Sequence, residues 1–364
     1  MSHSTVSNGS SKNSGEFPSG EFPSDVRILA IGDLHIQPDT LADINVFLKQ
    51  LDIWLSQNSV DLIVILGDTL HTHETVYTEC LNKMLEYIRV CEKYATTEVL
   101  VGNHDYCSNQ QFLTKAHPFA GWKSHRIVDY VKVSVVKGKK IILCPYVPDG
   151  RFYEALKTVG NEWETAECIF AHQLFDGAKM GPIIAKGVEK WDESAPFLVS
   201  GHIHDKQRVQ ENLWYTGSSM QISFGEREDH TLSLIHLSEE SLPIVEEINI
   251  HPPTKKTVYF DVSQAKEMKL PEEENVRVKV TLSGDSEEFK TFKKSGEYKK
   301  LVDKGVKVVF KQKRNVPMAE LPKTHLKSFP DILFSLIEED MLPLYTQLFN
   351  GKIGNGEDVE IVFE

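Results

Sequence analysis

Short apolar runs and amphipathic stretches alternate up to about residue 100. Val26 to Ile31 and Asp61 to Leu66 are almost continuously apolar, which is typical of strands buried on both faces. Glu98 to Val101 predicts a third such strand. Between these strands, Leu41 to Gln57 and Thr75 to Tyr94 repeat apolar residues at helical spacing. This β-α-β-α-β order predicts parallel strands joined by right-handed crossovers.

Beyond residue 130 the pattern changes to a succession of strands. Val131 to Val136 and Ile141 to Tyr146, joined by Lys137-Gly138-Lys139, predict an antiparallel hairpin. Later apolar runs predict further strands at residues 168–170, 197–199, 214–216, 231–236 and 244–250. Early α/β units followed by more strands predict an α/β fold, in which two packed β-sheets are flanked by helices.

A small second domain is predicted after the chain-breaking segment His251 to Thr254, which contains two prolines. Val276 to Leu282 alternates apolar and polar residues, a charged helical stretch follows from about Asp285, and Val306 to Phe310 predicts another strand. Residues 251–316 are therefore expected to form a basic β-α-β cap. Residues 26–250 would form the larger first domain.

The two ends of the chain have a different composition. Residues 1–25 are rich in Ser, Gly, Asn and Pro and cannot bury a core, so we expect a disordered tail. This tail repeats the unit Gly-Glu-Phe-Pro-Ser from Gly15 and from Gly20, and partner binding is an alternative role for the doubled unit. Residues 317–364 contain an amphipathic stretch that predicts two short helices.

Composition narrows the class of protein. The chain of 364 residues is 40% hydrophobic and 26% charged, and no stretch approaches the roughly 18 apolar residues of a membrane span. No apolar secretory segment is recognisable, and the five cysteines form no Cys-x-x-Cys pair. We therefore expect an intracellular protein, cytoplasmic or nuclear and not secreted, in a reducing compartment and with no membrane association.

The charge is unevenly distributed. A net charge of −13 argues against non-specific binding to DNA or to anionic membranes. The segment from His251 to Val316, however, holds 16 Lys and Arg against 10 Asp and Glu, a local net charge of +6. The predicted cap therefore differs in charge from the rest of the chain.

Five polar clusters follow the apolar runs of the first domain. They are Gly32-Asp33-Leu34-His35, Gly67-Asp68, Gly102-Asn103-His104-Asp105, Ala171-His172 and Gly201-His202-Ile203-His204. A strand that ends in Asp, Asn or His places a polar side chain at the carboxyl edge of a sheet, where ligand sites of α/β folds gather. If the five ends meet, they supply seven oxygen and nitrogen ligands, enough for two metal ions.

These ligand types indicate which metal chemistry is feasible. The candidates are Asp33, His35, Asp68, Asn103, His172, His202 and His204. A mixed carboxylate, amide and imidazole set without thiolates suits manganese, iron or zinc. Two ions about 3.5–4 Å apart can activate a bridging water and clamp a phosphoryl group. Taken singly, each cluster has a simpler interpretation as a turn, a helix cap or a core histidine, but their occurrence together favours a metal centre.

His104 is a poor further ligand beside Asn103. We expect it to act as a proton donor near the leaving oxygen, with Asp105 orienting its imidazole. The alternative is that His104 only hydrogen-bonds its own turn.

The ordered set Asp-x-His, Gly-Asp, Gly-Asn-His-Asp, Ala-His and Gly-His-x-His resembles the calcineurin-like metallophosphoesterase superfamily, over residues 26 to about 250. The resemblance implies one ion held by Asp33, His35, Asp68 and His204, and a second held by Asp68, Asn103, His172 and His202. It also implies that His104 is the catalytic histidine.

The segment after Gly67-Asp68 indicates a branch of this superfamily. Protein Ser/Thr phosphatases continue with Asp-Arg-Gly, whereas this chain continues with Thr-Leu-His71. It is more similar to the SbcD-type nucleases of DNA double-strand-break repair and their phage, viral and eukaryotic relatives. In these a histidine at the position of His71 helps to turn the DNA backbone into the site; a solvated helix start is the alternative for His71 and His73. A second likeness is the stretch Trp214 to Ser219 followed by Ser223 to Glu226, although Ser219 stands where proline is frequent.

The basic cap is a third point of resemblance, because SbcD-type nucleases carry a small β-α-β cap that helps to hold DNA. It suggests five phosphate contacts: Lys290, Lys293, Lys294, Lys299 and Lys300. A solvated lysine-rich helix face is the alternative. In that family an SbcC-type ATPase docks on a C-terminal helical segment, for which Phe329 to Leu348 is the candidate, unless it packs on the chain's own cap. A homodimer is also allowed.

The sequence thus predicts a two-metal DNA nuclease, most suited to manganese, that hydrolyses phosphodiesters at DNA ends within a recombination or repair complex. A phosphatase or phosphodiesterase for small molecules or phosphoproteins is the first alternative. A non-catalytic scaffold of the same fold is the second, and the presence of all seven candidate ligands argues against it.

Overall fold

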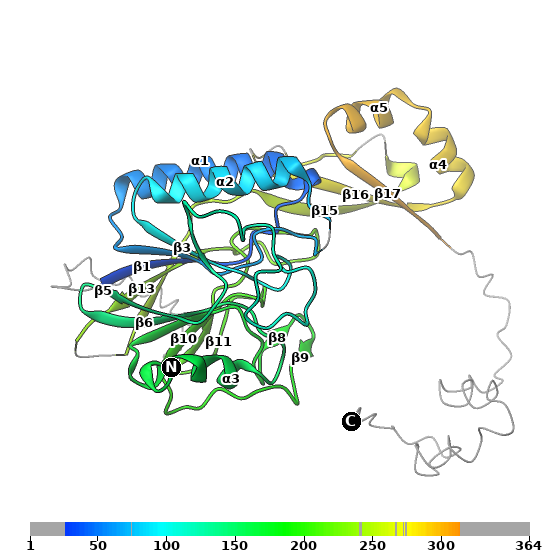
Figure 1. Cartoon of the computed structure of the whole chain (residues 1–364). Coiled ribbons are helices and arrows are strands. Elements are labelled where there is room, and N and C mark those ends of the chain that lie inside the picture. The colour runs from blue at the N-terminus through cyan, green and yellow to red at the C-terminus, as the bar shows by residue number, and fades with distance from the viewer. Residues whose placement is uncertain are drawn as a thin grey trace, which may run out of the picture. The chain divides into compact units, whose positions relative to one another are not determined.

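A computed structural model describes residues 26–313 apart from 74, 240, 241, 266, 267, 272 and 274 (Figure 1). The expected tail 1–25 and the segment 317–364, with the candidate docking stretch Phe329 to Leu348, lie outside the described residues. The described residues up to Lys311 belong to one compact unit, and the domain boundary at residue 250 stays a prediction. Within the described ranges, no helix has the length and apolar character needed to cross a bilayer.

The strands expected in the first hundred residues form the centre of the first sheet. Its strand order is β14 (Ile244–Ile248), β13 (Leu232–Leu237), β1 (Val26–Ile31), β2 (Leu62–Ile65), β3 (Thr96–Leu100) and β4 (Arg126–Val128). Strands β1 to β4 pair in parallel, as the alternating pattern predicted, and β13 and β14 continue the sheet antiparallel.

The second sheet contains the predicted hairpin. Its order is β11 (Gln207–Gln210), β12 (Leu213–Tyr215), β10 (Phe197–Ser200), β7 (Cys168–Ala171), β6 (Lys139–Cys144) and β5 (Lys132–Val136). The four inner strands are parallel, and β5 and β11 lie antiparallel at the two edges. The antiparallel pairing of β5 with β6 confirms the hairpin.

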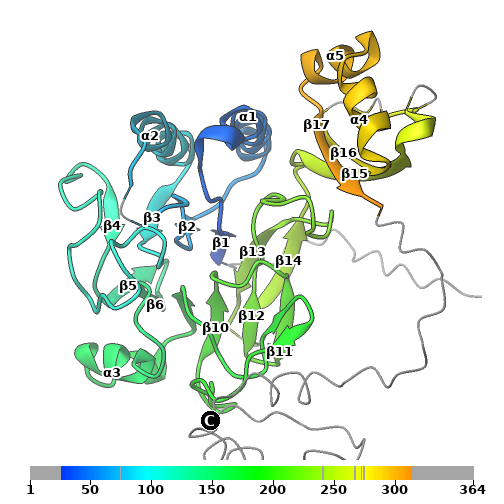
Figure 2. The ribbon, with the colours of Figure 1, turned by 90° about the vertical axis from the view of Figure 1, so that its right-hand side faces the viewer.

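The two sheets pack face to face, with helices on the outer faces. Ile28 and Ala30 of β1 lie in a cluster with Phe170 of the second sheet, whereas Leu29 and Ile31 point to the other face. This burial on both faces explains why β1 is continuously apolar. Helices α1 (Leu41–Gln57) and α2 (Thr78–Glu92) cover the first sheet, and α3 (Phe152–Leu156) lies on the opposite side, as Figure 2 shows. The predicted α/β fold of two packed sheets with flanking helices is therefore confirmed.

A separate three-stranded sheet follows residue 251, and it has one strand more than the sequence predicted. It consists of β15 (Thr254–Asp261), β16 (Val276–Gly284) and β17 (Lys307–Gln312), with α4 (Ser286–Lys293) and α5 (Gly296–Asp303) between the last two strands. The β-α-β prediction missed β15, which pairs in parallel with β16. Its first half is polar, so the sequence shows no apolar alternation there. We call residues 254–312 the small sheet.

Side-chain caps explain why the single predicted helical stretch is divided. Asp285 accepts hydrogen bonds from the backbone of Glu287 and Glu288 at the start of α4. Ser295 accepts one from Tyr298 at the start of α5. The remaining described elements are the hairpin strands β8 (Lys179–Met180) and β9 (Ile183–Ile184), and the 3-10 helices η1 (Pro38–Thr40), η2 (Lys157–Val159), η3 (Glu162–Thr165) and η4 (Val262–Gln264).

Candidate metal centre

The five polar clusters all follow the carboxyl ends of strands, and both large sheets contribute. Strands β1, β2 and β3 of the first sheet lead into the clusters that begin at Gly32, Gly67 and Gly102. Strands β7 and β10 of the second sheet lead into His172 and the segment from Gly201. The structure brings all seven candidate ligands together in one largely buried cluster.

The first group of ligand atoms comes from Asp33, His35 and His204, whose atoms lie within 4.8 Å of one another. The two Nε2 atoms of His35 and His204 are 3.1 Å apart. Oδ2 of Asp33 lies 3.8 Å from Nε2 of His204. Two imidazoles and one carboxylate therefore converge on one point.

The second group comes from Asp68, His172 and His202. The side-chain oxygen Oδ1 of Asn103 lies 2.9 Å from Nε2 of His172 and 2.9 Å from Nδ1 of His202. All four residues predicted for this group thus lie together, and His172 contacts each of the other three.

Asp68 lies between the two groups. Its Oδ2 is 3.5 Å from Nε2 of His35, and its Oδ1 is 3.3 Å from Nε2 of His172. One carboxylate therefore adjoins both groups, as a bridging ligand must. The grouping coincides with the two ligand sets that the resemblance implied, and ligation itself stays a prediction.

The carboxylate of Asp33 tests whether a cation fits here. Its Oδ1 accepts a hydrogen bond from the backbone N–H of His202 at 3.2 Å. Its Oδ2 is buried and has no hydrogen-bond partner among the described residues. A buried carboxylate oxygen left without a partner is costly, and a cation beside it removes that cost. The residues present therefore fit a pair of divalent cations bound by oxygen and nitrogen.

The protonation states of the imidazoles agree with this assignment. Burial lowers the pKa of His35 and of His202, in the latter case to about 3, so both rings are neutral at pH 7 and keep a lone pair for a metal. Burial also lowers the pKa of His172, but the negative charges of Asp68 and Asp33 have the larger effect and raise this pKa to about 9. Cation binding at His172 would release that proton.

Backbone conformation at three ligands is unusual. His35, Asp68 and His202 have φ values of 46°, 45° and 75°, in the left-handed region. Such a conformation costs a non-glycine residue of the order of 1–3 kcal/mol, and Asp, Asn and His adopt it more readily than most. Three of the seven described non-glycine residues with positive φ are therefore candidate ligands, and such strain is common at functional sites.

Crowding explains the glycines that precede the ligands. Gly67 has a φ of 103°, and a Cβ there would lie 2.8 Å from Cα of Gly102. A Cβ on Gly102 would lie 2.2 Å from the backbone nitrogen of Asp68. The two loops approach so closely that neither position accepts a side chain.

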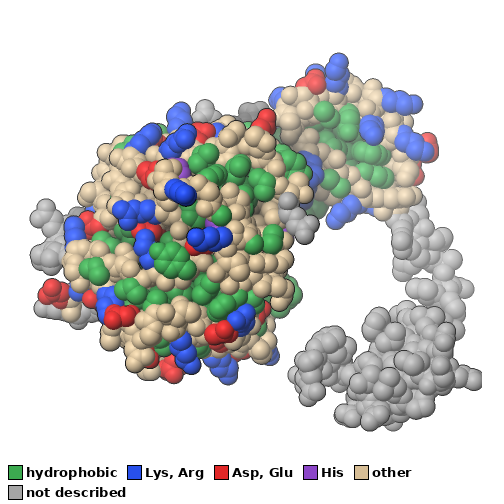
Figure 3. Space-filling view, viewed as in Figure 1, with side chains coloured by type: hydrophobic (Ala, Val, Ile, Leu, Met, Phe, Trp, Pro, Cys, Tyr) green, Lys and Arg blue, Asp and Glu red, His purple; other side chains and the backbone are tan. Residues whose placement is uncertain are grey.

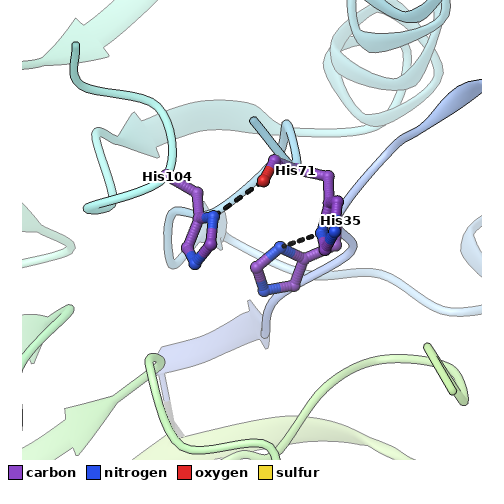
Figure 4. Close-up of side chains that lie close together, drawn as sticks. All are labelled: His35, His71 and His104. Carbon is purple, nitrogen blue, oxygen red and sulfur yellow. Dashed lines mark hydrogen bonds between the residues drawn. The ribbon is translucent and has the colours of Figure 1, made fainter. Parts of the chain in front are cut away.

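His104 and His71 lie beside the first ligand group (Figure 4). Nδ1 of His104 donates a hydrogen bond to the carbonyl of His71 at 2.7 Å, which leaves Nε2 for a substrate. Nδ1 of His71 is 3.3 Å from Nδ1 of His35, and the ring of His73 stacks on His104 with centroids 4.6 Å apart. His71 and His73 therefore contact the cluster instead of starting a helix, since α2 begins at Thr78.

The expected role of Asp105 is corrected by the structure. Its carboxylate accepts hydrogen bonds from Thr69 Oγ1 at 2.8 Å, from the N–H of Gly102 at 2.9 Å and from the N–H of Leu70 at 3.0 Å. The carbonyl of His71, and not Asp105, contacts Nδ1 of His104. Burial and the charge of Asp68 raise the pKa of Asp105 to about 7. Asp105 thus ties together the two loops that carry Asp68 and Asn103.

Sequence reasoning assigned no role to two residues that contact ligands. Oε1 of Glu226 lies 3.6 Å from Nδ1 of His204. The ring of Tyr146 stacks on His202, with centroids 5.9 Å apart. The resemblance of Ser223 to Glu226 to SbcD-type nucleases was a signal for Glu226. Tyr146 gave no such signal, because it lies in an apolar run that predicts a strand.

The five candidate lysines lie outside the ligand cluster, four of them on α4 and α5 and Lys294 directly after α4. All five are exposed, and Figure 3 shows Lys and Arg side chains over both helices. Lys290 pairs with Glu287 at 2.7 Å. The other four make no ion pair with another described residue: Lys293, Lys294, Lys299 and Lys300.

A groove of about 710 Å³ opens beside the metal centre. Two ligands, His202 and His204, line it together with the basic side chains of Lys179, Lys206 and Arg227. Substrate therefore has access to the ligand cluster from solvent.

Comparison with known proteins identifies the family. A protein-family model described as "Calcineurin-like phosphoesterase" matches residues 26–206 of this chain. The chain belongs to this family of phosphoesterases, which use divalent metals, and its His and Asp cluster offers side chains that could bind such metals.

Its relatives include two viral proteins. "Putative phosphoesterase 244L" of Invertebrate iridescent virus 6 is 40% identical over 276 residues, which cover 74% of this chain and 98% of the relative. "Putative phosphoesterase 078R" of Invertebrate iridescent virus 3 is 37% identical over 321 residues, which cover 86% of this chain and 92% of the relative.

Proposed function

We propose that this phosphoesterase is a metal-dependent DNA nuclease that hydrolyses phosphodiesters at DNA ends. The proposal rests on one observation. The unit that contains the candidate metal centre also presents four exposed lysines, between residues 293 and 300, that have no acidic partner among the described residues. A small phosphomonoester does not require such additional cations, whereas a polyanionic backbone does.

The seven candidate ligands would hold the two ions, with manganese the expected metal. When bound, the ions supply positive charge at the phosphoryl group and lower the pKa of a water. The phosphorus–oxygen bond to the attacking water oxygen forms as the bond to the leaving oxygen breaks. The attacking water gives up a proton to solvent. His104 would act as the imidazolium, protonated on both nitrogens: Nδ1–H stays on the carbonyl of His71, Nε2–H is given to the leaving oxygen, and the ring is left neutral.

Basic residues along the groove support a backbone substrate. Lys179 is exposed, and the Arg227 side chain is 74% exposed although it pairs with Asp229. His71 lies against His35 and is half-buried, where it would contact a sugar-phosphate backbone that enters the site. By the same resemblance, we propose that the protein works with an SbcC-type ATPase in DNA repair or recombination.

One comparison of substrates tests the proposal. The purified chain with Mn²⁺ is offered linear duplex DNA, single-stranded DNA and a chromogenic phosphomonoester, each across a salt titration. We expect DNA cleavage that weakens steeply with salt, since binding releases condensed counterions. The variant Asp68→Asn serves as the control for contaminating nucleases. Exclusive turnover of the monoester would overturn the DNA proposal and favour a small-molecule phosphatase.

A further inference from the structure

A loop between β12 and β13 connects one metal ligand to the small sheet. We call residues 221–226 the linking loop. At its end, Oε1 of Glu226 faces Nδ1 of His204 at 3.6 Å. On the other side of the same imidazole, Nε2 lies 3.1 Å from His35 and 3.8 Å from Asp33. The imidazole is thus placed between a carboxylate and the first ligand group.

The linking loop itself fixes the Glu226 carboxylate. Its Oε2 accepts a hydrogen bond from the backbone N–H of Ile222 at 2.7 Å. The side chain of Glu226 is only 20% exposed. The side-chain amide of Gln221 donates to the carbonyl of Glu226 at 3.0 Å. The hydrogen bond between Gln221 and Glu226 therefore holds the two ends of the loop together.

Strand β15 of the small sheet anchors the start of the linking loop. Gln221 accepts a hydrogen bond from the backbone N–H of Lys255 at 2.6 Å and donates one to its carbonyl at 3.0 Å. The Nζ of Lys255 donates to the carbonyl of Ile222 at 2.6 Å. Gln221 and Lys255 are 1% and 6% exposed, so water competes little for these bonds. Lys279 of β16 also lies over the ring of Phe224, 4.9 Å from its centroid.

We propose that Glu226 is a positioning residue for the metal ligand His204, and that Gln221 sets the position of Glu226 from β15. A carboxylate on the far nitrogen of a metal-binding imidazole orients the ring and makes it a better ligand. The small sheet would thereby act on the first ligand group, through His204. The hydrogen bonds described for Asn103 and His172 of the second group go to residues outside this loop. The inference concerns metal binding and stands whether the substrate is DNA or a small phosphoester.

Binding of Mn²⁺ to the full chain tests the role of Glu226, measured by calorimetry and by electron paramagnetic resonance of the free ion. Glu226→Ala should weaken one of two Mn²⁺ sites by about 10–100-fold and leave the other unchanged. Glu226→Gln, which keeps an acceptor oxygen, should restore part of that affinity. Glu228→Gln is the matched control, since Glu228 is exposed in the next turn of chain and should leave both sites unchanged.

Gln221→Ala tests the link to β15. It should weaken the same Mn²⁺ site as Glu226→Ala, by a smaller factor, and the double variant should add little to Glu226→Ala alone. A thermal melt of each variant without metal confirms folding. Unchanged Mn²⁺ affinity in Glu226→Ala overturns the proposal. If Glu226→Ala loses Mn²⁺ affinity and a folded Gln221→Ala does not, the link to the small sheet is overturned.

Discussion

The metal centre and the small sheet hold their charged groups in opposite ways. In the centre, carboxylates, imidazoles and the Asn103 amide contact one another at 2.9–3.8 Å, and they are fixed by strained turns and by glycines with no space for a side chain. In the small sheet, between residues 293 and 300, four lysines extend into solvent with no ion pair to another described residue. The electrostatic energy of a buried group depends on the residues it contacts directly, whereas exposed charges are screened by solvent and act through their total charge. Single exchanges should therefore be severe in the first region and mild in the second.

The largest effect is expected at Asp68, since it adjoins both ligand groups. Asp68→Asn keeps the shape of the side chain but removes the negative charge between the two ligand groups. The metal clamp is worth several kcal/mol, so turnover should fall roughly 10³-fold. Metal analysis after gel filtration should show fewer than two ions per chain. Two retained ions with normal turnover would contradict the bridging role.

His104→Ala should separate chemistry from metal binding. Its imidazole is a proton donor in our proposal and not a ligand, so both Mn²⁺ ions should remain while turnover falls about 10²–10⁴-fold. The backbone N–H of His104, which donates to Asp68 at 2.8 Å, is kept in this variant. A cleavage rate equal to that of the wild type, on any of the three substrates, would show that His104 has no such role.

A pair of glycine exchanges compares the packing of the two regions. Gly102→Ala places a methyl group 2.2 Å from the backbone of Asp68 and should destabilise the protein by about 1–3 kcal/mol, with loss of Mn²⁺ binding. Gly296→Ala, at the start of α5, meets nothing within 4 Å and should be neutral or slightly stabilising. Urea unfolding without metal measures both. Equal stabilities would mean that the ligand loops can move apart.

The smallest effect is expected for the lysines. We expect a weaker salt dependence of DNA binding when four lysines are exchanged to Gln: Lys293, Lys294, Lys299 and Lys300. The slope of log K against log salt concentration should become less negative by roughly 0.9 for each of these lysines that contacts a phosphate. Mn²⁺ affinity and thermal stability should not change. Lys290→Gln is the control, because Lys290 already pairs with Glu287 and should contribute less. An unchanged salt slope in the fourfold variant would leave these lysines as a solvated face.

The convergence of the candidate ligands could be predicted from the sequence because residue type and strand position coincide there. Asp33, Asp68 and His172 each follow a strand whose two-sided burial is visible as an apolar run. The contacts of Asp105 could not be predicted, since they depend on how closely the loops of Asp68 and Asn103 approach. Sequence spacing does not encode such an approach between segments far apart in the chain.

The small sheet was predicted less completely for a related reason. Strand β15 begins with a polar stretch, and it is specified by pairing with β16 and by the bonds between Lys255 and Gln221. The role of Glu226 depends on the same tertiary contacts. Local periodicity reports burial against one face, and it carries no information about a partner that is a side-chain amide 34 residues away.

The left-handed turns at His35, Asp68 and His202 restrict any redesign of the metal preference. A thiolate or a longer carboxylate at these positions would change the donor atom, but it would also put a less tolerant residue into a backbone shape that suits Asp, Asn and His. An engineer who wants a softer metal should therefore begin at His172 or His204, where the main chain makes no such demand.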